Sequence, residues 1–116
     1  MENIEMVLKA ASDRTRIRII KLLQNADELC VCEIISALDM RQAAVSRALS
    51  VLRNAGIVNA ERKGLWMYYS LNLNGKPDFF TGLSSLLKKR LNNDPVIKKD
   101  RAKLKDALKH NNKKAC

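Results

Sequence analysis

The sequence predicts a mainly helical domain that contains one small β-hairpin. Apolar residues recur at helical spacing both before residue 56 and after residue 77. Between these parts, two β-prone segments flank a short Lys-Gly-Leu link. The predicted order is therefore four helices, two strands and a fifth helix, with one further helix at the end.

The first three predicted helices are short. Helical spacing of apolar residues indicates a first helix over about residues 2–10. Ser12 or Asp13 is a suitable N-cap for a second helix, which residues 25–27 end. A third helix is expected over residues 30–38, because its apolar residues again have core spacing.

A fourth helix is expected over about residues 42–55, after a turn at residues 39–41. Gly56 stands where a helix favours a left-handed residue after its last turn. One face is apolar and the other is polar, and two adjacent helices of this kind fit a helix-turn-helix. The predicted buried residues are Val45, Ala48, Leu49 and Leu52.

The predicted hairpin pairs residues 57–62 with residues 66–71. Gly64 in the link is free to take a positive φ. Arg62 and Lys63 stand near the tip, where cations favour contact with phosphates or the minor groove over a purely structural role. A hairpin placed directly after a helix-turn-helix is typical of a winged helix-turn-helix.

The C-terminal part predicts two more helices. Pro77 begins a helix from about residue 78 to 91, whose apolar side is too broad for a surface helix. We therefore expect part of it to pack against a second subunit, in a homodimer formed through the terminal helices. A last helix is expected over residues 96–109, with a thin stripe of Ile97, Leu104 and Leu108. The expected division is a DNA-binding and dimerisation domain over residues 1–91, followed by a basic helix and flexible tail over residues 92–116.

The net charge of the chain narrows the range of possible functions. Lys and Arg number 22 against 12 for Asp and Glu, giving a formal net charge of +10. Such a field favours encounter with polyanions, of which nucleic acid is the leading candidate. The alternatives are a soluble protein that happens to be basic and a protein that binds acidic membrane surfaces. The first five residues lack the basic start of a signal peptide, and no apolar run is long enough to span a membrane. We expect a cytoplasmic protein with reduced cysteines.

Cys30 and Cys32 lie one residue apart, directly ahead of the predicted helix-turn-helix. Thiolates bind soft ions, and a disulfide between these two residues would close a strained ring. Residues two apart point about 200° from each other on a regular helix, so both can hold one ion only where the chain is extended or just entering the helix. Binding there should reshape the helix start and shift the helix packed on it. The alternative is that both are small buried apolar residues.

Several blocks together resemble the ArsR/SmtB family, most closely its arsenic-responsive repressors. They are the Cys30-Val31-Cys32 block with Glu28, Leu29 and Glu33, then Ala37-Leu38-Asp39, Val45-Ser46-Arg47, Leu49, Leu52-Arg53, Gly56, and Arg62, Gly64, Trp66 and Tyr69. Asp13, Thr15-Arg16 and Ile20 fit an earlier helix of the family. The resemblance covers about residues 4–91. It implies a homodimeric winged-helix repressor on palindromic operator DNA, released when trivalent arsenic or antimony (arsenite or antimonite) binds the thiolates.

The sequence departs from this family in three places. Ile35 stands where members with three clustered thiolates have the third cysteine, so Cys116 is the remaining candidate ligand, or else an unengaged terminal thiol. Arg41 replaces a common Ser cap ahead of the recognition helix and cannot cap it. The family's other metal site uses Asp and His on the dimer helix, whereas the single histidine here is His110.

The expected DNA contacts divide by role. Four residues are expected to face the major groove: Gln42, Ala43, Ser46 and Arg47. There Arg47 is expected to read guanine and Gln42 to read adenine. The alternative is that either residue contacts only phosphate. The other cations are expected to fix position on the phosphates. For each arginine the alternative is a solvated surface charge. The positioning group is Arg41, Arg53, Arg62 and Lys63.

Other functions remain open at this point. The same scaffold could respond to cadmium, lead, zinc or oxidants, or bind DNA without any ligand. An oxidant sensor would need a bridge longer than Cys30 to Cys32, for example through Cys116. Cadmium sites in the resembled family add thiols from the N-terminal segment, and residues 1–29 contain none. A thiol enzyme is not expected, since the chain lacks a Cys-x-x-Cys motif, a histidine beside the pair and a loop to cradle a substrate.

Overall fold

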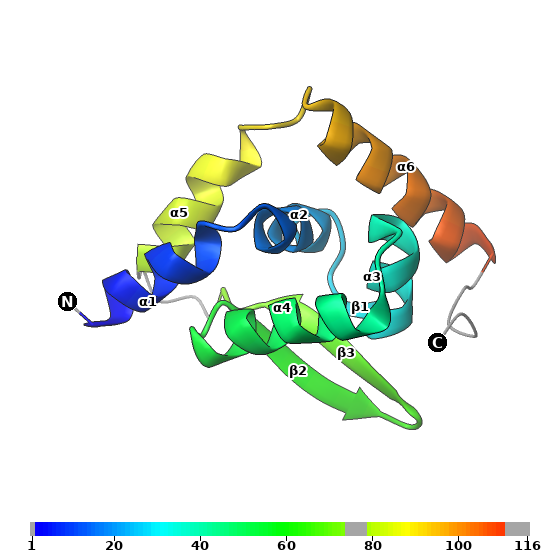
Figure 1. Cartoon of the computed structure of the whole chain (residues 1–116), viewed down its shortest axis with the longest axis horizontal. Helices are drawn as coiled ribbons and strands as arrows, with labels where there is room; N and C mark the ends of the chain where they lie inside the picture. The colour runs from blue at the N-terminus through cyan, green and yellow to red at the C-terminus, as the bar shows by residue number, and fades with distance from the viewer. Residues whose placement is uncertain (1, 74–78, 111–116) are drawn as a thin grey trace.

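The computed structural model describes residues 2–73 and 79–110, and Figure 1 shows how their helices and strands are arranged. The elements are α1 (Glu2–Ala11), α2 (Arg14–Leu23), β1 (Leu29–Cys30), α3 (Val31–Leu38), α4 (Gln42–Asn54), β2 (Val58–Lys63), β3 (Trp66–Leu71), α5 (Phe79–Lys88) and α6 (Pro95–His110).

The predicted fold class is confirmed: the chain is mainly helical and forms a winged helix-turn-helix. Asp13 is the N-cap of α2, and its carboxylate accepts a hydrogen bond from the Arg16 backbone N–H. The turn between α3 and α4 and the stop after α4 fall where expected. Gly56 and Gly64 both have positive φ, at 76° and 64°, which explains why glycine stands at the end of α4 and in the hairpin link.

The sheet has three strands instead of the expected two, in the order β1-β3-β2. The hairpin pairs β2 with β3 in antiparallel register, from Val58 opposite Leu71 to Lys63 opposite Trp66. The additional strand β1 pairs with β3 through Leu29 opposite Tyr69 and Cys30 opposite Tyr68. A two-residue strand has no periodicity of its own, so the sequence pattern gave no sign of it. The thiol segment is thereby tied to the wing, which comprises β2, β3 and the link at residues 64–65.

The core lies between α2, α3, α4 and the first residues of β2. All four residues predicted for the buried face of α4 are buried. The fully buried apolar side chains include Ile19, Ile20, Leu22, Leu29, Ile34, Leu49, Leu52 and Ile57. This core fixes the position of α4 relative to α2 and α3 and leaves the opposite face of α4 in solvent.

Lys21 is a buried lysine, only 2% exposed, that sequence patterning did not identify. Its Nζ donates to the backbone oxygens of Leu87 and Arg90 at 2.8 and 2.7 Å and to Asn92 Oδ1 at 3.0 Å. Leu87 lies in the last turn of α5, and Arg90 and Asn92 follow the end of that helix, so Lys21 binds oxygens at the C-terminus of α5. Burial lowers the pKa of Lys21, and the charge of Arg101 acts in the same direction.

α5 and α6 differ from the predictions in detail. α5 ends at Lys88, not at Leu91, which has φ 65° and lies in the connection to α6. The predicted start at Pro77 and Asp78 lies outside the described residues. Leu108 was expected in the apolar stripe of the last helix but is exposed, and Ala107 is buried instead. The predicted tail beyond His110 also lies outside the described part of the chain.

The last helix packs against α3 and α2, and it runs beside α3 in Figure 1. Its Asp100 is buried and pairs with Arg18 of α2 through two bonds, Nε to Oδ2 at 2.9 Å and Nη2 to Oδ1 at 2.8 Å. Arg18 Nη2 also donates to the backbone oxygen of Leu38 at 3.0 Å. A single guanidinium therefore joins α2, α6 and the end of α3. The Asp100 hydrogen bonds raise the pKa of Arg18, against the opposing effect of burial.

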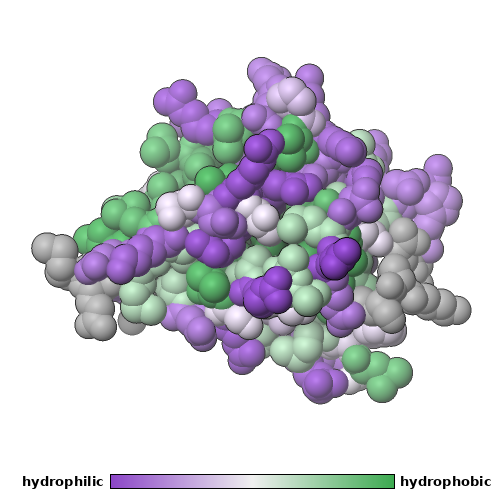
Figure 2. Space-filling model, in the orientation of Figure 1, coloured by the Kyte–Doolittle hydropathy of each residue, from purple (hydrophilic) through white to green (hydrophobic). Residues whose placement is uncertain are grey.

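An apolar surface extends over α1 and α5. These helices pack on each other, and hydrophobic residues gather at the left edge of Figure 2, where the two helices lie. The exposed apolar side chains there are Ile4, Met6, Leu8, Phe79 and Leu86. Among the described residues, no helix is both long and apolar enough to cross a lipid bilayer.

Candidate DNA-binding surface and thiol pair

α4 presents a polar face to solvent. Gln42, Ala43, Ser46 and Arg47, the four residues predicted to face the major groove, are all exposed. They occupy the first half of the helix, where a recognition helix enters the groove. The opposite face is held by the buried residues of α4, so the exposed residues project from a rigid support.

Arg41 is the N-cap residue of α4 in extended conformation, with φ −66° and ψ 144°. Its side chain makes no capping hydrogen bond, as expected, and it is exposed beside the helix start. Arg53 is exposed in the last turn of the same helix. The two arginines therefore stand at opposite ends of α4, as phosphate contacts on either side of a groove would require.

The two cations of the wing tip have different environments. Arg62 is exposed near the end of β2. Lys63 instead forms an ion pair with Glu28, with Nζ at 2.6 and 2.9 Å from the two carboxylate oxygens. Its ammonium also lies 5.5 Å from the centre of the Tyr68 ring. The bond to Glu28 raises the pKa of Lys63 and joins the wing tip to the segment that carries the thiols.

The cysteine pair lies at the junction of β1 and α3. Cys30 is the N-cap of α3 in extended conformation, with φ −78° and ψ 159°, and Cys32 is the second residue of the helix. The expectation that the pair falls where the chain enters a helix is confirmed. Both side chains are fully buried, with 0% exposure, so a ligand reaches them only if this junction opens. Cys30 is a free cysteine, whereas Cys32 is disulfide-bonded, so the expectation of reduced cysteines is wrong for Cys32 in this structure.

Glu33 closes the start of α3 and was not predicted as a site residue. Its carboxylate Oε1 accepts a hydrogen bond from the Cys30 backbone N–H at 2.9 Å. Burial raises the pKa of the Cys30 thiol, and the Glu33 carboxylate adds to this rise, while the Glu33 backbone N–H opposes it. The spacing of an N-cap and a Glu three residues later is the sequence signal that could have identified it.

No third ligand joins the pair within the described residues. Across residues 2–73 and 79–110, no group of three or more His, Cys, Asp or Glu side chains could hold a metal ion. Ile35 is half-buried one turn into α3, and Cys116 lies outside the described residues. His110 is on α6, where Nε2 lies 3.3 Å from Asp106.

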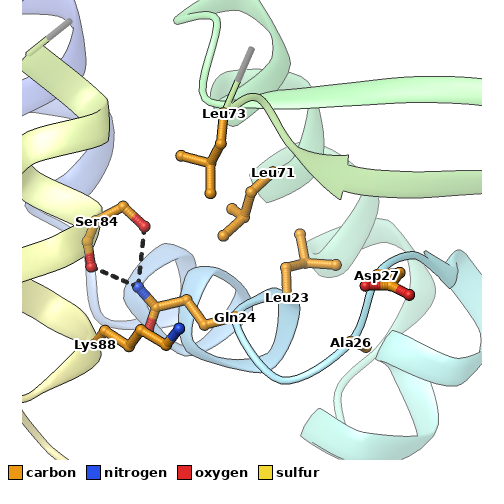
Figure 3. A pocket seen from close by; sticks show the side chains of 8 residues that line it. All are labelled: Leu23, Gln24, Ala26, Asp27, Leu71, Leu73, Ser84 and Lys88. Carbon is orange, nitrogen blue, oxygen red and sulfur yellow. Dashed lines mark hydrogen bonds between the residues drawn. The ribbon is translucent and has the colours of Figure 1, made fainter. Parts of the chain in front are cut away.

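A surface pocket of about 230 Å³ lies apart from the thiols, between the end of α2, α5 and the end of β3 (Figure 3). Its lining is Leu23, Gln24, Ala26, Asp27, Leu71, Leu73, Ser84 and Lys88. Within it, Gln24 Nε2 donates to the backbone and hydroxyl oxygens of Ser84 at 2.8 and 3.1 Å. These bonds tie α2 to α5, which gives the polar residues at the base of the pocket a structural role.

Comparison with known proteins places these features in a family. A family model described as "Bacterial regulatory protein, arsR family" matches residues 13–60, which include the thiol pair and α4. The chain is 46% identical over 67 residues to the arsenic resistance transcriptional regulator ArsR1 of Pseudomonas putida, covering 58% of this chain and 52% of that protein. It is 37% identical over 70 residues to a cadmium resistance transcriptional regulatory protein CadC homolog of Staphylococcus aureus, covering 60% and 58%. The alignments thus span little more than half the length of these two relatives.

A solved structure shares the architecture. The transcriptional regulator HlyU from Vibrio vulnificus superposes with a TM-score of 0.59 at 32% identity, over 71% of this chain and 80% of that one. The similarity extends beyond the segment that the family model matches and includes the winged arrangement of helices and strands.

Proposed function

Because this chain belongs to the ArsR family of DNA-binding transcriptional regulators, we propose that it is a repressor released from its operator by arsenite or antimonite. It is a regulator and not an enzyme. The observation that carries the proposal is the position of the thiol pair, which lies at the junction of β1 and α3 and is hydrogen-bonded to the wing.

The DNA-bound state is the first part of the proposal. The exposed half of α4 enters the major groove, with Arg47 and Gln42 reading base edges and Ser46 and Ala43 beside them. Arg41, Arg53 and Arg62 contact phosphates. Lys63 contributes to the positive field at the wing tip, although its ion pair with Glu28 limits it as a direct contact. A net charge of +10 per chain supports rapid association with DNA.

The operator-binding unit is a homodimer. None of the residues that the structure describes covers the apolar surface over α1 and α5, and solvent exposure of such a surface is unfavourable. Packing two copies through this surface gives two α4 helices related by a two-fold axis, which a palindromic operator matches. The face of α6 that carries Asp100 and Leu104 is buried within the chain, so α6 contributes little apolar surface to this contact.

The inducer site consists of Cys30 and Cys32. Sulfur is the donor that trivalent arsenic and antimony bind most strongly, and the described part of the chain has no histidine beside the pair. The extended backbone of Cys30 lets its sulfur leave the direction that a regular helix would impose. Cys116 supplies the third sulfur. Replacement of Cys116 by Ser should weaken arsenite binding, and an unchanged affinity would remove Cys116 from the site.

Release follows from the bonds around Cys30. Its backbone pairs with Tyr68 in β3 on one side and with the Glu33 carboxylate at the start of α3 on the other. Because both side chains are buried, binding an ion to the reduced pair requires this junction to open, which breaks one or both of these contacts. The wing then loses its link to α3, and α3 shifts against α4. Ligand binding and DNA binding thus favour different arrangements of the same segment.

The proposal is tested by titrating the complex of the reduced protein with its own promoter DNA. Arsenite, antimonite, cadmium, zinc and peroxide are added in parallel, and the bound fraction is followed by fluorescence anisotropy. Release by arsenite and antimonite at the lowest concentrations is expected. Failure of the untreated protein to prefer its promoter over unrelated DNA overturns operator binding, and indifference to every addition overturns the sensor role.

A second candidate inducer is cadmium, favoured by the similarity to a cadmium resistance regulator. If only cadmium releases the protein from DNA in the same titration, cadmium is the inducer. Oxidants are a further alternative, because Cys32 is disulfide-bonded in the structure. Peroxide attacks thiolates, however, and burial raises the pKa of the Cys30 thiol, which disfavours oxidation at that residue.

A further inference from the structure

α6 carries a dense set of cations outside the segment that the family model matches. Its basic residues outnumber its acidic ones, and one of the two acidic residues, Asp100, is neutralised by Arg18 in the interior. The surface of the helix is therefore strongly positive. Figure 2 shows hydrophilic residues at the upper right, where α6 lies. The basic residues before the terminal His110 are Lys98, Lys99, Arg101, Lys103, Lys105 and Lys109.

One side of α6 lies at the turn of the helix-turn-helix. Lys103 Nζ pairs with Asp39 Oδ2 at 3.0 Å, and Asp39 is the residue that ends α3. Lys99 is one helical turn earlier on the same side. The bond from Lys103 lowers the pKa of Asp39 most, and the charge of Lys99 adds to the effect. Asp39 is two residues from Arg41, the N-cap of α4, so Lys103 lies near the start of the helix that the proposed function places in the major groove.

The location of α3 makes DNA the partner for this side of α6. In a helix-turn-helix the first helix crosses the DNA backbone while the second enters the major groove. α3 is that first helix, and α6 packs along it. We propose that α6 extends the DNA-binding surface of this chain, with Lys99 and, once it leaves its ion pair with Asp39, Lys103 contacting backbone phosphates beside the recognition helix. This inference rests on the proposed operator binding and adds a contact region to it.

The opposite side of α6 provides a matched control. Lys105 is two residues after Lys103 and points about 200° away around the helix axis. It borders a shallow pocket with Asn25, Arg101, Leu104 and Leu108, on the side away from Asp39. Lys109 follows Lys105 by one turn. Both are exposed, so the Lys105→Gln, Lys109→Gln variant removes the same charge from a face that does not meet DNA.

The salt dependence of promoter binding is the first test. Each phosphate contact contributes about 0.9 to the slope of log affinity against log salt concentration. Lys99→Gln with Lys103→Gln removes two contacts per chain, so a dimer should lose about 3.6 of slope. The control variant should change the slope much less. Equal slopes for the two double variants overturn the proposal, because they leave only a general effect of net charge.

Asp39→Asn separates phosphate contact from a purely structural bond. Asparagine tolerates the left-handed conformation of Asp39, which has φ 54° and ψ 49°, so the turn keeps its backbone. Releasing Lys103 from its ion pair should strengthen promoter binding and steepen the salt slope. That gain should disappear when Lys103→Gln is added. If Lys103 only anchors the turn, Asp39→Asn weakens binding instead, and the proposal is wrong.

The experiments distinguish failure of the α6 proposal from failure of the proposed function. Failure of the unmodified protein to bind its promoter selectively contradicts the proposed function. Selective binding with an unaltered slope in Lys99→Gln, Lys103→Gln contradicts the role of α6 alone. Thermal unfolding of each variant, expected to match the unmodified chain because the side chains lie at the surface, excludes misfolding as the cause of a change.

Discussion

At the scale of single residues, Cys30 combines three roles. It pairs with Tyr68 through its backbone, begins α3 as the N-cap, and carries a buried thiol. Glu33 stabilises the same junction by accepting from the Cys30 N–H. Under the proposed function, an ion bound to this residue acts on two elements of the DNA-binding surface at once, which an ion bound in the middle of a helix would not do.

The pKa of Cys30 predicts how inducer binding depends on pH. Since burial raises this pKa, the residue is a protonated thiol at neutral pH. Cadmium must displace that proton, so its affinity should fall by about tenfold per pH unit for each bound thiol as pH drops from 8 to 6. Arsenous acid releases water and no net proton, so arsenite affinity should stay nearly constant. Competition titrations with a chromophoric chelator for cadmium, and protein fluorescence for arsenite, would check this. Equal pH dependence for both would contradict the protonated state.

Arg47 is the residue expected to carry base recognition. Arg47→Ala should reduce the preference for the promoter over a site with one changed guanine by about 1–3 kcal/mol, while non-specific binding changes little. Arg53→Ala is the matched control at the far end of α4, and it should weaken binding to all sequences similarly. Competition binding with promoter variants measures both. An Arg47→Ala protein with undiminished discrimination would place the base contact elsewhere.

At the scale of elements, the position of α6 depends on the pair of Arg18 and Asp100. Asp100→Asn keeps the shape of the side chain but leaves the Arg18 guanidinium largely enclosed without its counter-ion. We expect a loss of about 2–3 kcal/mol in the free energy of unfolding, less than for a fully enclosed pair because Arg18 retains some contact with solvent. Asp106→Asn, at an exposed site on the same helix, should cost under about 0.5 kcal/mol. Urea unfolding measures both, and similar values for the two would contradict the role assigned to the pair.

Sequence periodicity predicted the helices well, but it did not predict which other elements they contact. The buried face of α4 was predicted correctly, because its four apolar residues at helical spacing can be buried together only if that face turns toward the core. β1 was missed because its two residues are defined only by pairing with Tyr68 and Tyr69, some 40 positions away. The positions of Lys21 and Asp100 were missed for a related reason: their charges are compensated by groups on distant helices. The thiol pair was found by composition, whereas its link to the wing required the structure.

At the scale of the whole molecule, the chain has two surfaces with different chemistry. The apolar surface lies over α1 and α5, and the polar, basic surface includes α4, the wing tip and one side of α6. Figure 1 places α1 and α5 on the side of the molecule opposite to α6. This separation agrees with the proposal that one surface joins two copies while the other contacts DNA.

Leu86→Glu tests the dimer surface. Leu86 is 55% exposed, so the change should not disturb the fold, but it puts a charge into the proposed contact. We expect dissociation to monomers at micromolar concentration by sedimentation velocity. Leu65→Glu, at a leucine that is 84% exposed in the wing link, should leave the dimer intact. An unchanged sedimentation coefficient for Leu86→Glu would move the interface away from α5.

The central claim is that an ion at Cys30 and Cys32 controls affinity for DNA. The most direct measurement is the promoter dissociation constant of the reduced protein with and without saturating arsenite, compared with the Cys30→Ser, Cys32→Ser variant. We predict that arsenite weakens promoter binding by about 5- to 150-fold in the unmodified chain, the usual range for coupled sites, and has no effect on the variant. Equal weakening in both proteins, or none in the unmodified chain, would contradict the claim.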